Sequence, residues 1–369
     1  THHFGNALLP DKNVPIANEI YMEKAREFAT RHDLSPDRTW RSWEQGPSKI
    51  FLNDLEHKFN IEVIAHLNEI GLKSLVTTTN SWGRMPLSSL PSLTDSDIVD
   101  AHSYGKTEFL STNPRQDDNF ISWIGAAQVN EKPLSVTEWN IEEFPAYDRF
   151  SSPVYLAGTS ALQGWDALMQ YGYGQVPLNN EGRPSNWGVY NDPGSLALMP
   201  AAALIYRQGH VSSAKTTYAL VLDQNTFFNT GVSPENSATI RTLIEQSKLV
   251  ISVPETKELP WLKSNIIAKT TEIISDYNKD FIAEGQNFVS SDTGEIKRDW
   301  ENSVYTINTE NSQLATGKIG GKSISLDNLE IQIITENAAV AAQSLDNISL
   351  KNSEKILISL AGQSRLSEG

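Results

Sequence analysis

The sequence contains no cysteine, which excludes disulfides, thiol nucleophiles and thiolate metal sites together. It also lacks any apolar run approaching the roughly 18 residues that a membrane span requires. Basic residues are in the minority, because 30 Lys and Arg against 45 Asp and Glu leave a net charge of −15. No membrane span is expected, because no apolar run is long enough. No nucleic-acid partner is expected either, because no basic stripe offsets the negative charge. The predicted ligand is neutral or is bound by local contacts.

The composition is that of a globular protein, and its aromatic residues are its one hint of function. Hydrophobic residues make up 39% and charged residues 20%, as in an ordinary globular protein. The length of 369 residues predicts two or three folded domains. The chain also has 9 Trp, 11 Tyr and 12 Phe. Sugar-binding clefts use such aromatic faces, although most aromatic residues in any protein belong to the core.

Residues 1–210 alternate helix-like and strand-like stretches. The clearest helix has apolar residues at steps of three and four from Leu52 to Ile70, and Gly71 ends it. Strands alternating with helices predict an α/β fold with a parallel sheet. Four units are visible, so the domain is either a small open sheet or strands 5–8 of a (β/α)8 TIM barrel whose first half precedes Thr1. We predict helices at 16–32, 54–70, 119–129, 153–163 and 194–208, and strands at 73–79, 97–104, 133–139 and 167–173.

From residue 211 the alternation of helices and strands gives way to several short β-branched runs. Residues 211–369 therefore predict a second, β-rich domain, a β-sandwich packed on the first. One helix is expected at 237–248. Gly320-Gly321 and Asp327-Asn328 are typical of hairpin turns. Short β-branched runs predict strands at 217–222, 304–308, 324–326, 329–335 and 355–360.

The chemistry-bearing residues are expected at the carboxyl ends of the predicted strands, because reactive groups of parallel α/β folds lie there. A carboxylate, a histidine, a tyrosine and indoles on one rim suit glycosidic-bond chemistry. Each residue alone has a plainer interpretation, such as a helix cap for Glu138 or core packing for Tyr104 and Trp165. The four strand ends supply, in order, Asn80 and Trp82; His102 and Tyr104; Glu138 and Asn140; and Tyr173, with Trp165 just before the fourth strand.

Two short segments resemble clan A retaining glycoside hydrolases, which are (β/α)8 barrels. These are Asp100-Ala101-His102-Ser103-Tyr104 and Thr137-Glu138-Trp139-Asn140, which are similar to the sixth and seventh strand ends of that clan. The resemblance implies that Glu138 is the nucleophile and that His102 or Tyr104 contacts it. It also implies an aromatic residue of the last strand, here Tyr171 or Tyr173, beside the substrate, and a β-sandwich after the barrel.

The same resemblance implies a carbohydrate substrate, no metal or other cofactor, and an extracellular or periplasmic location. The acid/base glutamate of the clan usually follows an Asn at the fourth strand end. Asn18-Glu19 and Asn68-Glu69 both fall inside predicted helices, so the acid/base is expected upstream of Thr1. His3 would then lie in an active-site loop.

Two alternatives stay open at this point. One is a carbohydrate-binding or scaffolding protein that keeps the fold without turnover. The other is a small open α/β domain with an unrelated ligand. The sequence has no HExxH helix, no phosphate-binding glycine loop and no Gly-x-Ser-x-Gly elbow, so these other catalytic motifs give no competing prediction.

Overall fold

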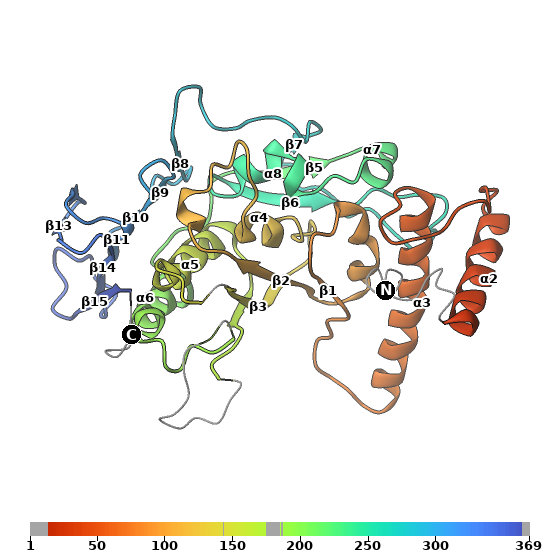
Figure 1. Cartoon of the computed structure of the whole chain (residues 1–369), viewed down its shortest axis with the longest axis horizontal. Coiled ribbons are helices and arrows are strands. Elements are labelled where there is room, and N and C mark those ends of the chain that lie inside the picture. The colour runs from red at the N-terminus through yellow and green to blue at the C-terminus, as the bar shows by residue number, and fades with distance from the viewer. Residues whose placement is uncertain (1–13, 143, 175–184, 186, 364–369) are drawn as a thin grey trace.

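Four parallel strands form the sheet around which the first half of the chain is built. The structure, a computed structural model, describes residues 14–142, 144–174, 185 and 187–363. The strands are β1 (Asn80–Ser81), β2 (Val99–Gly105), β3 (Leu134–Ile141) and β4 (Ala167–Gln170), and each pairs in parallel with the next. Because chain order equals sheet order, all four carboxyl ends lie along one edge (Figure 1).

Two helices of this half have a recognisable cap, one at its start and the other at its end. Asn119 and Ser122 form a capping box at the start of α4 (Phe120–Gly125). Gly164, with a φ of +69°, ends α5 (Ser152–Gln163) in the left-handed conformation that favours glycine. The other helices are α2 (Pro15–Arg31), α3 (Pro47–Glu69) and α6 (Pro193–Arg207), with short 3-10 helices η1 (Leu87–Ser89), η2 (Pro91–Asp95), η3 (Phe109–Ser111) and η4 (Arg149–Ser151).

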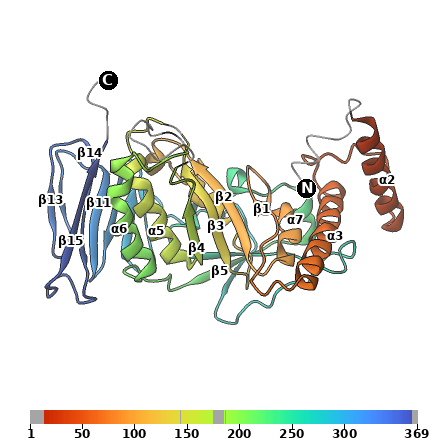
Figure 2. The ribbon, with the colours of Figure 1, turned by 90° about the horizontal axis from the view of Figure 1, so that it is seen from below.

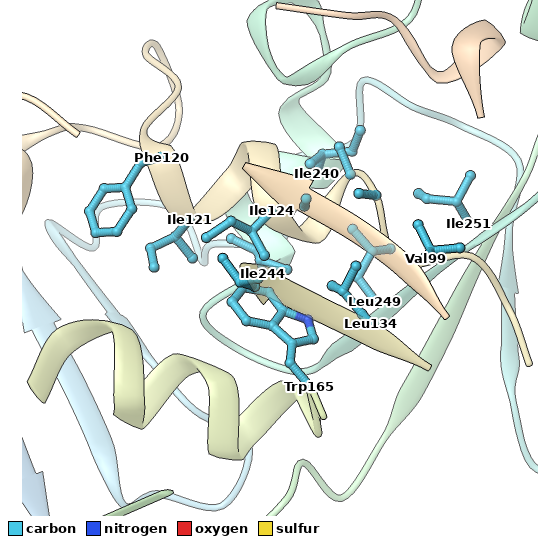
Figure 3. Close-up of a cluster of buried hydrophobic side chains, with 14 of the residues drawn as sticks. Val99, Phe120, Ile121, Ile124, Leu134, Trp165, Ile240, Ile244, Leu249 and Ile251 are labelled. Carbon is cyan, nitrogen blue, oxygen red and sulfur yellow. The ribbon is translucent and has the colours of Figure 1, made fainter. Parts of the chain in front are cut away.

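A second parallel sheet packs against α4 and α5. At Gly125 the helix α4 approaches this layer so closely that a Cβ atom added by substitution would clash with Cδ1 of Ile244. The Gln163 side chain ties α5 to this layer, because it donates to the carbonyls of Ile244 and Ser247 over 2.6 Å each. Figure 3 shows the apolar side chains that fill the space between the two sheets. The layer consists of β5 (Thr217–Val221), α7 (Gln224–Asn229), η5 (Pro234–Asn236), α8 (Ala238–Leu243), β6 (Lys248–Ser252) and β7 (Glu272–Ile274), with strand order β6-β5-β7.

The C-terminal part is an antiparallel sheet of six strands, and α5 and α6 separate it from the first parallel sheet (Figure 2). Tyr305 packs on Tyr155 of α5 with ring centroids 5.2 Å apart, so the sheet and the α/β layers share one apolar core. The hairpin of β12 (Ser323–Ser325) and β13 (Glu330–Gln332) forms a separate small sheet. The six strands are β8 (Phe288–Ser290), β9 (Ile296–Asp299), β10 (Val304–Asn308), β11 (Ser312–Lys318), β14 (Asn337–Ser344) and β15 (Ile356–Gly362), in the order β15-β14-β11-β10-β9-β8.

These layers confirm a mixed α/β protein with parallel sheets followed by an antiparallel sheet. The predicted helices at 16–32, 54–70, 153–163 and 194–208 are present as α2, α3, α5 and α6. Within the described residues, no helix combines the length and the apolar character needed to cross a membrane. The barrel itself, and the division of the chain at 210, stay predictions.

Several local predictions were wrong. The strand expected at 73–79 is irregular and is replaced by β1, because the Val76 amide bonds the Asp97 side chain instead of a neighbouring strand. The helices expected at 119–129 and 237–248 are each only six residues long. Gly320-Gly321 is not a hairpin turn, because β11 pairs with β10 and β14 and not with β12. Asp327-Asn328 does close the β12–β13 hairpin.

Candidate functional site

The predicted nucleophile and both of its predicted partners meet at the carboxyl ends of β2 and β3. The Tyr104 hydroxyl donates a hydrogen bond to Oε2 of Glu138 over 2.5 Å. Nδ1 of His102 lies 3.3 Å from the same oxygen. Within the described chain, Oε1 of Glu138 has no hydrogen-bond partner, and the side chain is 31% exposed. One carboxylate oxygen is therefore held, and the other has no hydrogen-bond partner among the described residues.

A β-bulge just before Glu138 sets this arrangement. Ala101 pairs with Val136, but the next residue, His102, pairs with Glu138, so Thr137 is the extra residue. Its amide and hydroxyl both donate to the Asp100 carboxylate, over 3.2 Å and 2.7 Å. Bulges re-aim the side chains that follow them. Here the bulge places Glu138 directly beside His102 instead of one residue further along β2.

The hydrogen bonds around Thr137 indicate which ring nitrogen of His102 carries a hydrogen. Because the Thr137 hydroxyl donates to Asp100, it accepts from Nε2 of His102 at 2.9 Å. Nε2 therefore carries a hydrogen. The other ring nitrogen, Nδ1, is the one that lies beside Oε2 of Glu138.

Aromatic rings enclose the tyrosine that binds Glu138. Trp187 and Tyr171 both pack edge-on against Tyr104, with ring centroids 5.0 and 6.5 Å away. Burial, together with the hydrogen bond to Glu138 and its negative charge, raises the pKa of Tyr104 well above its usual value. The phenol therefore stays protonated, and remains a hydrogen-bond donor, across the whole range of pH in which the protein would be assayed.

Asn140 supports the site from below instead of lining it. Its side chain is completely buried and donates to the carbonyl of Tyr171 over 2.6 Å. Its Oδ1 accepts from the Ile141 amide and from the buried Arg149 guanidinium, over 2.8 and 3.2 Å. Asn140 therefore fixes the end of β3 against the segment after β4, and the substrate contact predicted for it has no exposed atom to use.

A cleft of about 570 Å³ opens beside His102 and Tyr104, over the ends of β1 and β2. Trp82 projects into it with 45% of its surface exposed. Trp123 of α4 forms part of the opposite lining, and its indole donates to Asp118 over 2.5 Å, which fixes the ring. The charged lining residues keep the acidic balance of the whole chain, with two basic against three acidic side chains: Arg84, Lys106, Asp117, Asp118 and Glu142.

One wall of the cleft, the segment 110–118, is anchored by three arginines. Arg298 of β9 donates to the carbonyls of Leu110 and Thr112. Arg241 of α8 donates to the carbonyls of Pro114 and Arg115. Arg115 itself pairs with Asp280 over 2.6 Å and reaches three carbonyls of residues 282–286. The C-terminal half of the chain therefore shapes the cleft.

The remaining predicted site residues do not join this group. Trp165 is 2% exposed and lies in the apolar core of Figure 3, where no substrate could reach it. Tyr173 is 60% exposed and packs on Tyr190, and within the described chain it makes no contact with Glu138. Asn80 is half-buried in β1, where it pairs with Asp100 in the strand register. His3 lies outside the described residues.

Sequence reasoning did not select Asp100, Trp123 or Trp187. Asp100 stands two residues before His102 on the same face of β2, so its proximity could have been inferred from the strand period. Trp123 is on the helix after β2, where a long loop hides its direction. Trp187 is 83 residues from Tyr104, and no local pattern signals their contact.

Comparisons with protein-family models, with curated proteins and with solved structures give no match to this chain. Within the described residues, no cluster of three or more His, Asp or Glu side chains is arranged to hold a metal ion. The function is therefore inferred from the geometry of the site.

Proposed function

We propose that the chain carries the nucleophile of a retaining glycoside hydrolase that acts on an oligo- or polysaccharide, with Glu138 as that nucleophile. The observation that supports this most is the partly exposed carboxylate of Glu138, in which Oε2 contacts Tyr104 and His102 while Oε1 has no hydrogen-bond partner among the described residues. A retaining enzyme needs such a carboxylate, fixed in direction and accessible to the anomeric carbon. The adjoining cleft, with its exposed indole, suits a neutral glycan.

In the proposed reaction, Oε1 of Glu138 forms a bond to the anomeric carbon while the bond from that carbon to the leaving oxygen breaks. The leaving oxygen takes the electron pair and a proton from a second carboxyl group, which later activates water. Tyr104 and His102 hold Oε2 in the glycosyl ester as they do in the free carboxylate. Their fixed positions mean that little reorganisation is needed when charge moves off Glu138.

The fold proposed with this function is the second half of a (β/α)8 barrel. Support comes from β1 to β4, which are neighbours in strict chain order, all parallel, with the site at their carboxyl ends. This is the arrangement of strands in such a barrel. The antiparallel sheet behind α5 and α6 takes the place of the β-sandwich that the resemblance implies.

The proposal is tested by trapping the glycosyl-enzyme. The full chain is incubated with 2,4-dinitrophenyl 2-deoxy-2-fluoroglycosides, as mono- and disaccharides of the common pyranoses in both anomeric forms. Dinitrophenolate leaves without protonation, so the first step needs no acid/base group and tests Glu138 alone. The fluorine slows hydrolysis of the ester, so it accumulates. Intact mass spectrometry is expected to show one added fluorosugar, and peptide mapping is expected to place it on Glu138.

Glu138→Gln is the matched variant and should gain no mass, because its amide is a poor nucleophile. If no compound labels the wild-type chain while the same chain binds the parent oligosaccharides, the carbohydrate-binding alternative replaces the hydrolase. Labelling of any other residue would contradict the assignment of Glu138.

The two tryptophans of the cleft are expected to contribute to glycan binding. Trp82→Ala and Trp123→Ala, each in the Glu138→Gln background, should weaken binding of neutral hexasaccharides about tenfold, or about 1.4 kcal/mol. The physical reason is the loss of an apolar ring face under a sugar. Isothermal titration calorimetry measures the change. Trp43→Ala is the control, because Trp43 is 61% exposed but does not line the cleft. Equal affinities for all three variants would exclude the cleft as the glycan site.

A further inference from the structure

Asp100 is a buried carboxylate that the proposed chemistry does not use. It is 4% exposed and lies on β2, two residues before His102. Three groups of β3 donate to it: the Ser135 hydroxyl over 2.6 Å, and the amide and hydroxyl of Thr137. Nε2 of His102 is 3.2 Å from its Oδ2. Burial raises the pKa of Asp100, but hydrogen bonds from His102, Ser135 and Thr137 outweigh it and hold the pKa below its usual value.

These contacts control both connections to Glu138. Through Thr137, Asp100 holds the bulge that immediately precedes Glu138 in β3. Through the hydroxyl of Thr137 and its own Oδ2, it faces Nε2 of His102 and keeps the hydrogen on that nitrogen. The opposite nitrogen, Nδ1, is thereby directed at Glu138. A carboxylate that only formed a buried ion pair would need just one of these contacts. Asp100 contacts both the Thr137 bulge and the His102 side chain, which together orient the Glu138 carboxylate.

We propose that Asp100 is the positioning residue of this site, which acts through His102 and the Thr137 bulge to fix the Oε2 atom of Glu138. The proposal rests on the proposed function for its effect on reactivity, but the geometric part stands separately. Asp100 does not touch substrate. Its role is to set which ring nitrogen of His102 carries hydrogen and where the Glu138 carboxylate points.

Asp100→Asn separates this role from a merely structural one. The amide has nearly the same size, but one of its two ends donates where the carboxylate accepts. If Oδ1 keeps the bonds from Ser135 and the Thr137 amide, the NH₂ group faces Nε2–H of His102. The ring can then avoid two opposed donors by moving its hydrogen to Nδ1 or by turning away.

The test has two independent readouts on the full chain. In the first, ¹⁵N-histidine NMR between pH 6 and 8 reports which ring nitrogen of His102 is protonated, with His102→Gln used to assign the signals. The wild type should show hydrogen on Nε2, and Asp100→Asn should lose that signature. In the second, the rate of labelling by the reactive fluoroglycoside should fall about 10–100-fold, as is typical when a group that orients a reactive side chain is removed.

Asp292→Asn is the control, because Asp292, in the turn between β8 and β9, also accepts three hydrogen bonds, from Lys215, Thr216 and Ser247 just before β5 and β6. It should change neither readout. Thr137→Val serves as a second variant in case Asp100→Asn does not fold, since it removes only the hydroxyl that links Asp100 to His102. It should also alter the His102 signals and slow labelling several-fold.

The outcomes distinguish this proposal from the proposed function. If the wild type is never labelled but Asp100→Asn still changes the His102 tautomer, the positioning role holds and the hydrolase assignment fails. If the wild type is labelled and both variants keep the wild-type His102 signals and labelling rate, Asp100 is a structural residue and the inference is overturned.

Discussion

Replacing Glu138 by glutamine is expected to reduce the release of dinitrophenolate from an activated aryl glycoside by about 10⁴-fold, or about 5.4 kcal/mol of transition-state stabilisation. The amide oxygen is a weak nucleophile, yet the side chain keeps its shape. Binding should therefore change little, and the loss should appear in kcat and not in KM. Stopped-flow absorbance of the phenolate measures both parameters. Glu354→Gln, at an exposed carboxylate between β14 and β15 of the antiparallel sheet, should behave as the wild type.

A smaller residue in place of Glu138 provides the stereochemical test. In Glu138→Gly, added azide can occupy the vacated space and attack the anomeric carbon in place of the carboxylate. The product should be a glycosyl azide of inverted configuration, because the ion performs only the first of the two displacements of a retaining reaction. Recovery of activity with azide, with that product identified by NMR, would assign the nucleophile. Full activity of Glu138→Gln without azide would remove Glu138 from the mechanism.

Arg298→Met is expected to lower the free energy of unfolding by about 3–5 kcal/mol, the largest single effect on stability that we predict. The guanidinium is completely buried and binds Glu245 in a bidentate pair, with N–O distances of 2.7 and 2.5 Å. Burial alone would lower the pKa of Arg298, but the charge of Glu245 outweighs it and raises the pKa above its usual value. Removing the arginine leaves Glu245 charged, buried and unpaired. Urea unfolding followed by circular dichroism measures the change.

The double variant Glu245→Leu/Arg298→Met distinguishes the cost of an unpaired charge from the value of the pair. Without either charge, most of the lost stability should return, because buried ion pairs contribute little beyond well-packed apolar groups. An exposed pair, Lys24 and Glu27, supplies the comparison, and Lys24→Met should leave the midpoint of urea unfolding nearly unchanged, because solvent screens exposed ion pairs. If Arg298→Met alone lowers the free energy of unfolding by less than about 1 kcal/mol, the burial of Glu245 without a partner does not carry the cost assigned to it.

The residues of the site were predictable where strand order and strand period carry the information. His102, Tyr104 and Glu138 stand at the ends of two adjacent parallel strands, so their meeting follows from topology. The bulge at Thr137 was not predictable, because it depends on the buried Asp100 carboxylate drawing in a backbone amide. Trp165 was misassigned since a residue just before a strand can point to the core or to the rim, and only the packing of α8 and β6 decides which.

The C-terminal strands were harder to predict for a different reason. β14 is Asn-Ala-Ala-Val-Ala-Ala-Gln-Ser and β11 is Ser-Gln-Leu-Ala-Thr-Gly-Lys, and neither is rich in the β-branched and aromatic residues typical of strands. Their small side chains allow close packing against α6, where Gln343 donates to the carbonyl of Ala201 over 3.1 Å. Tertiary contacts therefore impose a strand conformation that the local sequence does not favour.

The arginine anchors of the segment 110–118 bear on how this protein could be shortened. A chain ending at 210, the predicted boundary, would keep Glu138, His102 and Tyr104 but lose Arg241 and Arg298, together with every partner of Arg115 beyond its own turn. The carbonyls that these guanidinium groups bind would turn to water, and the segment would lose its fixed path. Such a fragment would retain Glu138 but lose one wall of the cleft. Under the proposed function, the recognition of long glycans should therefore be more sensitive to truncation than the proposed step at Glu138.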